Sequence, residues 1–92
     1  MALQPADVEE KITQALYYLD RIIHDMGIPR NIRRVASEAA RVLRNTQMSP
    51  GLRASTAVGL LDEALNDPNM PAFSRVLILQ IIAILEQVKD VV

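Results

Sequence analysis

Cysteine and tryptophan are absent from this 92-residue chain, and histidine, glycine and aromatic side chains are scarce. The absence of cysteine excludes thiol catalysis, disulfides and thiolate metal sites. A chain this short that needs no disulfides is more typical of the cell interior than of secreted proteins. Two tyrosines and one phenylalanine are too few for the aromatic platform on which single-stranded nucleic acids stack.

Long hydrophobic runs are also missing. The longest, residues 76–85 with Gln80 inside it, has about half the length that a membrane span needs. Near the N-terminus the first apolar residues are followed at once by Asp7, Glu9 and Glu10, which argues against a signal peptide. Half of the residues are hydrophobic. We therefore expect one folded, cytoplasmic domain spanning residues 1–92, with no membrane partner.

The residue types that usually carry catalysis are equally sparse. The single histidine, His24, shares a helix face with Asp20, but two ligands do not make a metal site. No serine has a histidine base and a glycine-rich turn around it, and the three glycines form no phosphate-binding loop. The sequence therefore predicts a protein that is not an enzyme, with no catalytic residue, metal, cofactor or small-molecule substrate.

An internal repeat emerges when the chain is shifted by 42 residues against itself. A period near forty in a helical sequence is typical of paired-helix repeats, in which each unit is one helical hairpin. We therefore predict two related hairpins, at about residues 5–46 and 49–90. The identical residues that coincide without a gap are Ala15/Ala57, Leu19/Leu61, Asp20/Asp62, Asp25/Asp67, Pro29/Pro71, Arg33/Arg75 and Leu43/Leu85.

Proline, glycine and capping residues divide these hairpins into four helices. Pro5 suits the first turn of a helix, and Gly27 is expected to end that helix in a left-handed cap. Pro29, Ser49 with its following proline, and Pro71 open the other three, the last running to about residue 89. Because the connections are short, sequential helices should be antiparallel neighbours. The predicted fold is all-α, a four-helix up-and-down bundle, with an open two-repeat solenoid as the alternative.

The fourth helix is apolar around its whole circumference. Residues 76–85 contain one polar side chain, Gln80, whereas each helix of a four-helix bundle has an outward face. Exposed apolar patches usually mark interaction sites, so the sequence predicts self-association, with a twofold homodimer as the expected form. The alternative is that the first helix, or Val91 and Val92, cover this helix. The predicted self-association residues are Leu77, Ile78, Ile81, Ile82 and Leu85.

Positive charge is concentrated in the second helix. Residues 28–53 carry six arginines and one acidic residue, although the whole chain has a net charge of −1. At about 100° per residue, five of these arginines fall on one side of the helix. Their planar guanidinium groups suit the phosphates of structured RNA or the carboxylates of an acidic protein. The five are Arg33 and the four candidate residues for binding an anionic partner, Arg30, Arg34, Arg41 and Arg44.

A second interpretation of this arginine-rich side is purely local. The arginines could pair with carboxylates of the neighbouring helices, such as Asp20, Asp25 and Glu63. Two acid–arginine pairs, Asp20/Arg33 and Asp62/Arg75, recur at the same spacing across the hairpin turns. They are expected to clamp the two helices of each hairpin, with about 0–1 kcal/mol per ion pair. Both turns lead into an even-numbered helix, so they should lie at the same end of the bundle.

Four segments resemble the characteristic segments of a small archaeal family, the uncharacterised protein family 0147. They are IPRNIRR at 28–34, PGLR at 50–53, LLDE at 60–63 and NDPNMP at 66–71. The resemblance extends over essentially the whole chain and implies an all-helical, intracellular archaeal protein with no assigned biochemical function. The turn at 25–36 is also similar to that of HEAT-type repeats, although the spacing from Pro29 to Arg33 is one residue longer than usual.

Together these features favour a non-enzymatic helical interaction module that self-associates through the fourth helix. The alternative function is a small RNA- or ribonucleoprotein-associated protein that binds through the arginines of the second helix.

Overall fold

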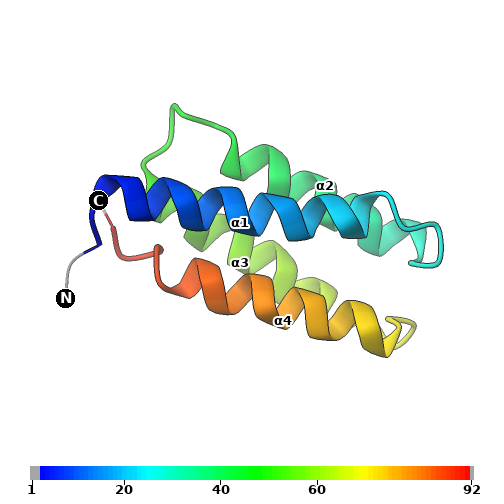
Figure 1. Cartoon of the computed structure of the whole chain (residues 1–92). Coiled ribbons are helices and arrows are strands. Elements are labelled where there is room, and N and C mark those ends of the chain that lie inside the picture. The colour runs from blue at the N-terminus through cyan, green and yellow to red at the C-terminus, as the bar shows by residue number, and fades with distance from the viewer. Residues whose placement is uncertain (1–2, 92) are drawn as a thin grey trace.

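The computed structural model describes residues 3–91, in which four helices are joined by short loops (Figure 1). Consecutive helices run antiparallel, and α1 also packs against α4, which closes the ring of contacts. The fold is therefore the predicted all-α up-and-down bundle and not the open solenoid, with dimensions of 37 × 24 × 19 Å. The helices are α1 (Pro5–Ile23), α2 (Arg30–Leu43), α3 (Pro50–Ala64) and α4 (Ala72–Glu86).

The helix starts follow the local signals in the sequence, whereas two of the predicted ends are wrong. Proline opens or immediately precedes each helix, and the Ser49 hydroxyl accepts a hydrogen bond from the Leu52 N–H at the start of α3. The α1 helix ends at Ile23, well before Gly27, and no described glycine has a positive φ. The Gly27 N–H instead donates to the Asp25 carboxylate, at 2.8 Å. Similarly, α4 ends at Glu86 rather than near residue 89.

The core lies where the apolar stripes of the four helices meet. Each large aliphatic side chain removed from water there stabilises the fold by roughly 1.5–3 kcal/mol. The α2 and α3 helices also contribute six buried alanines, and such small side chains allow two helix backbones to approach closely. The large side chains that are fully buried are Leu19, Ile22, Ile28, Ile32, Leu43, Leu61, Ile78, Ile81, Leu85 and Val88.

All three loops between helices share one geometry. Each begins with an Asp or Asn whose side chain accepts a hydrogen bond from the N–H two residues later, and whose carbonyl accepts one from the N–H three residues later. This Asx turn reverses the chain with little strain. An apolar residue follows, which is buried at Ile28 and Met70 and half-buried at Met48. An extended residue then precedes the next helix. The turn residues are Asp25, Asn45 and Asp67.

An arginine in the first turn of each following helix stabilises these loops. Arg33 and Arg75 donate to the carbonyl oxygens of Ile28 and Leu65, at 2.9 and 3.0 Å. Arg53 donates in the same way to the Leu43 carbonyl, at 2.9 Å. Arg53 and Arg75 thus bind carbonyl oxygens at the ends of α2 and α3, which a terminating helix leaves without partners. Arg33 instead binds a carbonyl oxygen of the loop itself.

The predicted acid–arginine clamps are therefore wrong. The guanidinium groups of Arg33 and Arg75 reach backbone oxygens and not the carboxylates of Asp20 and Asp62, and among residues 3–91 neither arginine forms an ion pair. The companion prediction is confirmed, because the α1–α2 and α3–α4 loops lie at the same end of the bundle (Figure 1). A hydrogen bond from the Asn31 side chain, in the first turn of α2, to the Asp67 carboxylate in the α3–α4 loop joins the two hairpins at this end.

Candidate interaction surfaces

The outward side of α4 carries three large apolar side chains. Phe73, Val76 and Leu79 are 50%, 55% and 50% exposed, and Ala83 is exposed one turn further along. These positions follow the i, i+3 and i+4 spacing of a single helix face. We call Phe73, Val76, Leu79 and Ala83 the α4 outward face.

The predicted self-association residues divide between the core and the flanks of α4. Ile78, Ile81 and Leu85 are at most 1% exposed and belong to the core, so their prediction as surface residues is corrected. Leu77 and Ile82 are half-buried and pack against the core. Because α4 is apolar all round, it has no amphipathic pattern that would define which side faces the core. Gln80 was the available signal, since it is exposed and lies beside Leu79 on the outward side.

The C-terminal turn does not cover the α4 outward face. Val91 instead lies at the start of α3, where its carbonyl oxygen approaches the Cα of Gly51 so closely that a Cβ there would collide with it. Val92 lies outside the described residues. The α1 helix packs beside α4, and Phe73, Val76 and Leu79 stay half exposed in spite of this contact. Neither α1 nor Val91 therefore covers the α4 outward face, although both were predicted as possible covers.

The neighbouring outward side of α3 is also free of charge. Between Arg53 and Asp62 the helix contains no charged residue, and Ser55, Thr56 and Gly59 are exposed. No side chain or other backbone lies within 4 Å of the position that a Cβ on Gly59 would take. Since α3 and α4 pack against each other, their uncharged middle sections form one side of the bundle.

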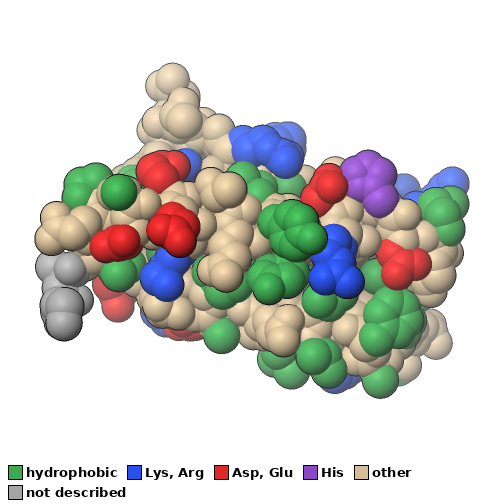
Figure 2. Space-filling model, viewed as in Figure 1, with side chains coloured by type: hydrophobic (Ala, Val, Ile, Leu, Met, Phe, Trp, Pro, Cys, Tyr) green, Lys and Arg blue, Asp and Glu red, His purple; other side chains and the backbone are tan. Residues whose placement is uncertain are grey.

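The opposite half of the molecule is charged. In Figure 2 acidic side chains gather over the N-terminal half of α1, and basic side chains lie along α2 and at the end of the bundle where α1 joins α2. The predicted arginines Arg30, Arg34, Arg41 and Arg44 are all exposed, and we call these four the arginine ridge. Three of them border a shallow depression of about 570 Å³, together with Ser37 and Asn45.

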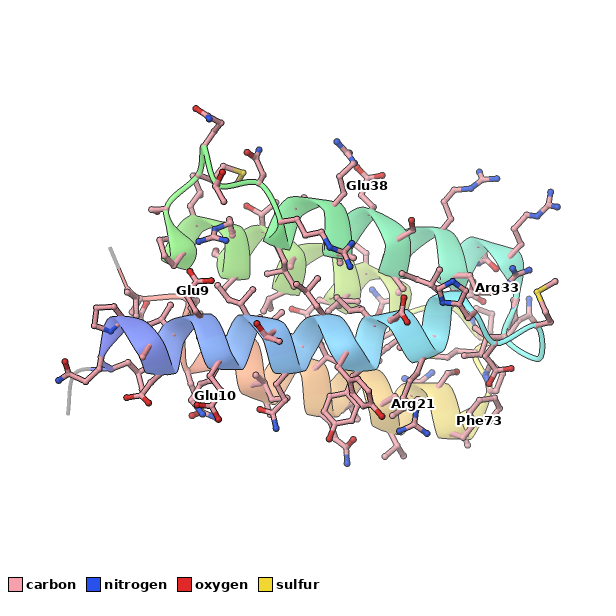
Figure 3. The ribbon with its side chains drawn as sticks, turned by 45° about the horizontal axis from the view of Figure 1, so that its top comes forward. Glu9, Glu10, Arg21, Arg33, Glu38 and Phe73 are labelled. Carbon is pink, nitrogen blue, oxygen red and sulfur yellow. The ribbon has the colours of Figure 1, made fainter. Side chains whose placement is uncertain are left out.

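One carboxylate interrupts the arginine ridge. Glu38 lies 2.6 Å from the Arg41 guanidinium, and the Glu38 side chain projects away from the bundle in Figure 3. Among residues 3–91, no ion pair joins Arg30, Arg34 or Arg44 to Asp20, Asp25 or Glu63. The interpretation of this ridge as local ion pairing therefore fails for three of its four members.

Arg53 is a buried arginine that was not among the predicted site residues. It is 6% exposed, donates to the Leu43 carbonyl, and lies 3.5 Å from the carboxylate of Glu9 on α1. Its Nε has no hydrogen-bond partner in the described part of the chain. A signal for this role exists in the sequence, because an arginine stands four residues after each of the extended residues Pro29, Ser49 and Pro71.

Two further polar contacts involve His24 and Lys89. The imidazole Nδ1 of His24 lies 3.2 Å from the Asp20 carboxylate, and both side chains are exposed. Across residues 3–91, no three His, Asp or Glu side chains are grouped as metal ligands would be. Near the C-terminus, a hydrogen bond and the negative charge of Glu86, at 2.6 Å, raise the pKa of the exposed Lys89. In the same described range, no helix combines the length and hydrophobicity required to span a membrane.

Comparison with known proteins identifies relatives over nearly the whole chain. A protein from Saccharolobus islandicus (strain L.S.2.15) is 46% identical over 86 residues, which cover 94% of this chain and 97% of the relative. One from Methanopyrus kandleri is 51% identical over 86 residues, covering 92% and 83%. Both are described as UPF0147 proteins.

Two solved structures share the fold. The crystal structure of the unknown function protein MMP1188 has a TM-score of 0.86 and 36% identity, and covers 98% of this chain and 99% of its own. A protein from the uncharacterized family UPF0147 of Thermoplasma acidophilum has a TM-score of 0.85 and 34% identity, with 90% and 98% covered. The model of the uncharacterised protein family UPF0147 matches residues 1–88. The chain described here therefore belongs to the family UPF0147, as the segments at its turns predicted.

Proposed function

We propose that this protein is a non-enzymatic helical interaction module of the cytoplasm, and that it self-associates through the α4 outward face. The observation that carries the proposal is the half-exposure of Phe73, Val76 and Leu79 on a helix with no charge between Arg75 and Glu86. Exposed apolar side chains are common singly, but a group of them on one helix face marks an interaction site.

The energy available from this face suits a reversible dimer. Full burial of a large apolar side chain yields roughly 1.5–3 kcal/mol, so covering the exposed halves of three residues in each of two copies yields about 5–9 kcal/mol. Association costs about 4–15 kcal/mol in lost translational and rotational freedom. The uncharged side of α3 has to add contact area for the dimer to form. We therefore expect a weak dimer that dissociates into monomers when the protein is diluted.

The shape of the bundle also accommodates a second copy. One side of the molecule measures at most 37 by 24 Å, which has room for the ~800 Å² that each partner contributes to a standard interface. A twofold axis would bring the same face of both copies together. Because Ser55 and Thr56 have small side chains and Gly59 has none, the middle of α3 allows a neighbouring helix to approach closely. Leu52, which is 54% exposed, adds an apolar side chain at the start of this side.

The test is the mass in solution, measured by light scattering across a dilution series for the unmodified chain and for Leu79→Glu. The substitution should convert the dimer into a folded monomer, because a carboxylate in an apolar interface loses its hydration. Leu79 is a better position than Ile82, which packs against the core. The matched control is Tyr17→Glu, which places the same charge on the exposed side of α1.

The masses of the three proteins distinguish an interface on α4 from other arrangements. A Leu79→Glu monomer with a native helical circular dichroism spectrum, beside a Tyr17→Glu dimer, supports an interface on α4. A monomeric unmodified chain at every concentration would contradict self-association, and dimers in all three proteins would place the interface elsewhere.

A further inference from the structure

The arginine ridge is exposed, aligned and largely unpaired. Its ends, Arg30 and Arg44, are 14 positions apart, which corresponds to about 21 Å along the helix axis. Arg30, Arg34 and Arg44 lack ion pairs within residues 3–91, and Glu38 neutralises only Arg41. The three uncompensated charges along one face repel each other, and a bound anion would relieve this repulsion.

The structure separates these arginines from those that serve the fold. Arg33, Arg53 and Arg75 are buried or half-buried, and each donates to a backbone carbonyl beside a loop. Figure 3 places Arg33 at the end of the bundle where α1 turns into α2. The four ridge residues have no such role, because none of their guanidinium groups donates to a described backbone oxygen.

We propose that the arginine ridge binds the phosphate backbone of base-paired RNA. Arginine forms paired hydrogen bonds to phosphate through its planar guanidinium. The ridge and the depression beside it contain no aromatic residue, and without aromatic stacking a single strand would be held weakly. The ligand that matches this chemistry is a duplex whose phosphates are fixed in space.

The shape of the surface favours an RNA duplex over a DNA duplex. The α2 helix is flanked on both sides by packed neighbours, α1 and α3, so its arginines lie on a broad face and not on a projecting helix. A major groove of B-DNA is about 12 Å wide and 8.5 Å deep, which admits a single protruding helix but not this side of a bundle. The minor groove of an RNA duplex is wide and shallow, and proteins read it by shape and phosphate contacts.

This binding surface is independent of the proposed dimer interface. In the ring of helices α2 and α4 are diagonal and not adjacent, so the arginine ridge and the α4 outward face point away from each other. A dimer formed through α4 would carry one ridge on each outer side. The RNA proposal can therefore fail while self-association holds, and the reverse is also true.

The experiment is fluorescence anisotropy with a labelled RNA duplex, repeated at increasing salt. Four phosphate contacts predict a slope of about −3.6 in a plot of log affinity against log salt, so binding should weaken roughly 150-fold between 50 and 200 mM. Changing all four ridge arginines to glutamine should abolish measurable binding. The single change Arg34→Gln should reduce the slope by about 1.

Two controls separate the ridge from general charge effects. Arg21→Gln removes one exposed arginine from α1, which changes the net charge as much as Arg34→Gln does and should leave the slope unchanged. A variant with lysine at the four ridge positions keeps the charges and should retain the salt slope, because counterion release depends on charge. It should nevertheless bind more weakly than the unmodified chain, because lysine lacks the planar guanidinium that pairs with phosphate.

Several results would overturn the proposal. These are no binding to the RNA duplex at 50 mM salt, equal losses from Arg21→Gln and Arg34→Gln, and tighter binding to a DNA duplex of the same sequence. Binding of an acidic polypeptide such as polyglutamate in place of RNA would assign the ridge to an acidic protein partner.

Discussion

Two glycines in α3 should respond to the same substitution in opposite directions. At Gly59 the space around an added Cβ is empty, so alanine should raise stability by about 0.5–1 kcal/mol through its higher helix propensity. At Gly51 an added Cβ would lie 2.7 Å from the Lys89 carbonyl oxygen, and closer still to that of Val91. Because both neighbours are backbone atoms, no side-chain rotation relieves the contact.

The cost at Gly51 follows from what must move. The turn at residues 88–91 has to leave its place on α3, and Val88, which is fully buried, loses part of its burial with it. Overpacking of this kind costs typically about 1–3 kcal/mol. Since 1 kcal/mol corresponds to about 4–8 °C in a domain of this size, Gly51→Ala should lower the Tm by about 8–16 °C for a 2 kcal/mol loss.

Thermal unfolding followed by circular dichroism, at a concentration where the chain is monomeric, measures both effects. A chain ending at Gln87 supplies the control, because it lacks the carbonyl groups that approach Gly51. In that shorter chain Gly51→Ala should lose its cost if the chain remains folded. An unchanged or higher Tm for Gly51→Ala in the full chain would refute the contact between the C-terminal turn and α3, and with it the reasoning.

Two further predictions concern arginine and lysine contacts. Arg75→Gln should lower the free energy of unfolding by about 1–2 kcal/mol, because the Leu65 carbonyl loses a charged donor. Asp62→Asn should change the free energy of unfolding by less than about 0.5 kcal/mol. Urea unfolding measures both values, and a larger loss from Asp62→Asn would support the acid–arginine clamp. Glu86→Gln should return the pKa of Lys89 toward its usual value of 10.5, as measured by NMR titration. Because the folded pKa is raised, this pair contributes to stability below about pH 10.5, and the contribution disappears as the pH rises through the folded pKa.

Most of the fold could be predicted because its signals are local. A proline near each helix start and an Asp or Asn in each loop act within a few residues, so they determine where helices begin and where the chain turns. Short loops then impose antiparallel neighbours. The Gly27 cap was wrong for an equally local reason, since the Asp25 side chain accepts the Gly27 N–H in an Asx turn and no left-handed residue is needed.

The candidate surfaces were predicted unequally. The arginine ridge could be placed because α2 is strongly amphipathic, so its apolar stripe defines the opposite, exposed side. The α4 outward face could not, because apolar side chains surround that helix. Ile78 and Leu79 have almost the same hydrophobicity, and yet one is buried and the other half exposed.

The sequence by itself therefore determined the number of helices, their approximate starts, their antiparallel order and the exposed position of Arg30, Arg34, Arg41 and Arg44. The contact of α1 with α4 in the tertiary structure decided between a closed bundle and an open solenoid. The tertiary structure alone decided which side of α4 faces the core, because that depends on how α1 and α3 pack against it. It also decided the partners of Arg33 and Arg75. The spacing in the sequence suggested carboxylate partners, but the path of the chain brings the Ile28 carbonyl in the α1–α2 loop to Arg33 and the Leu65 carbonyl at the end of α3 to Arg75. A carbonyl oxygen where a helix stops has no partner within the helix.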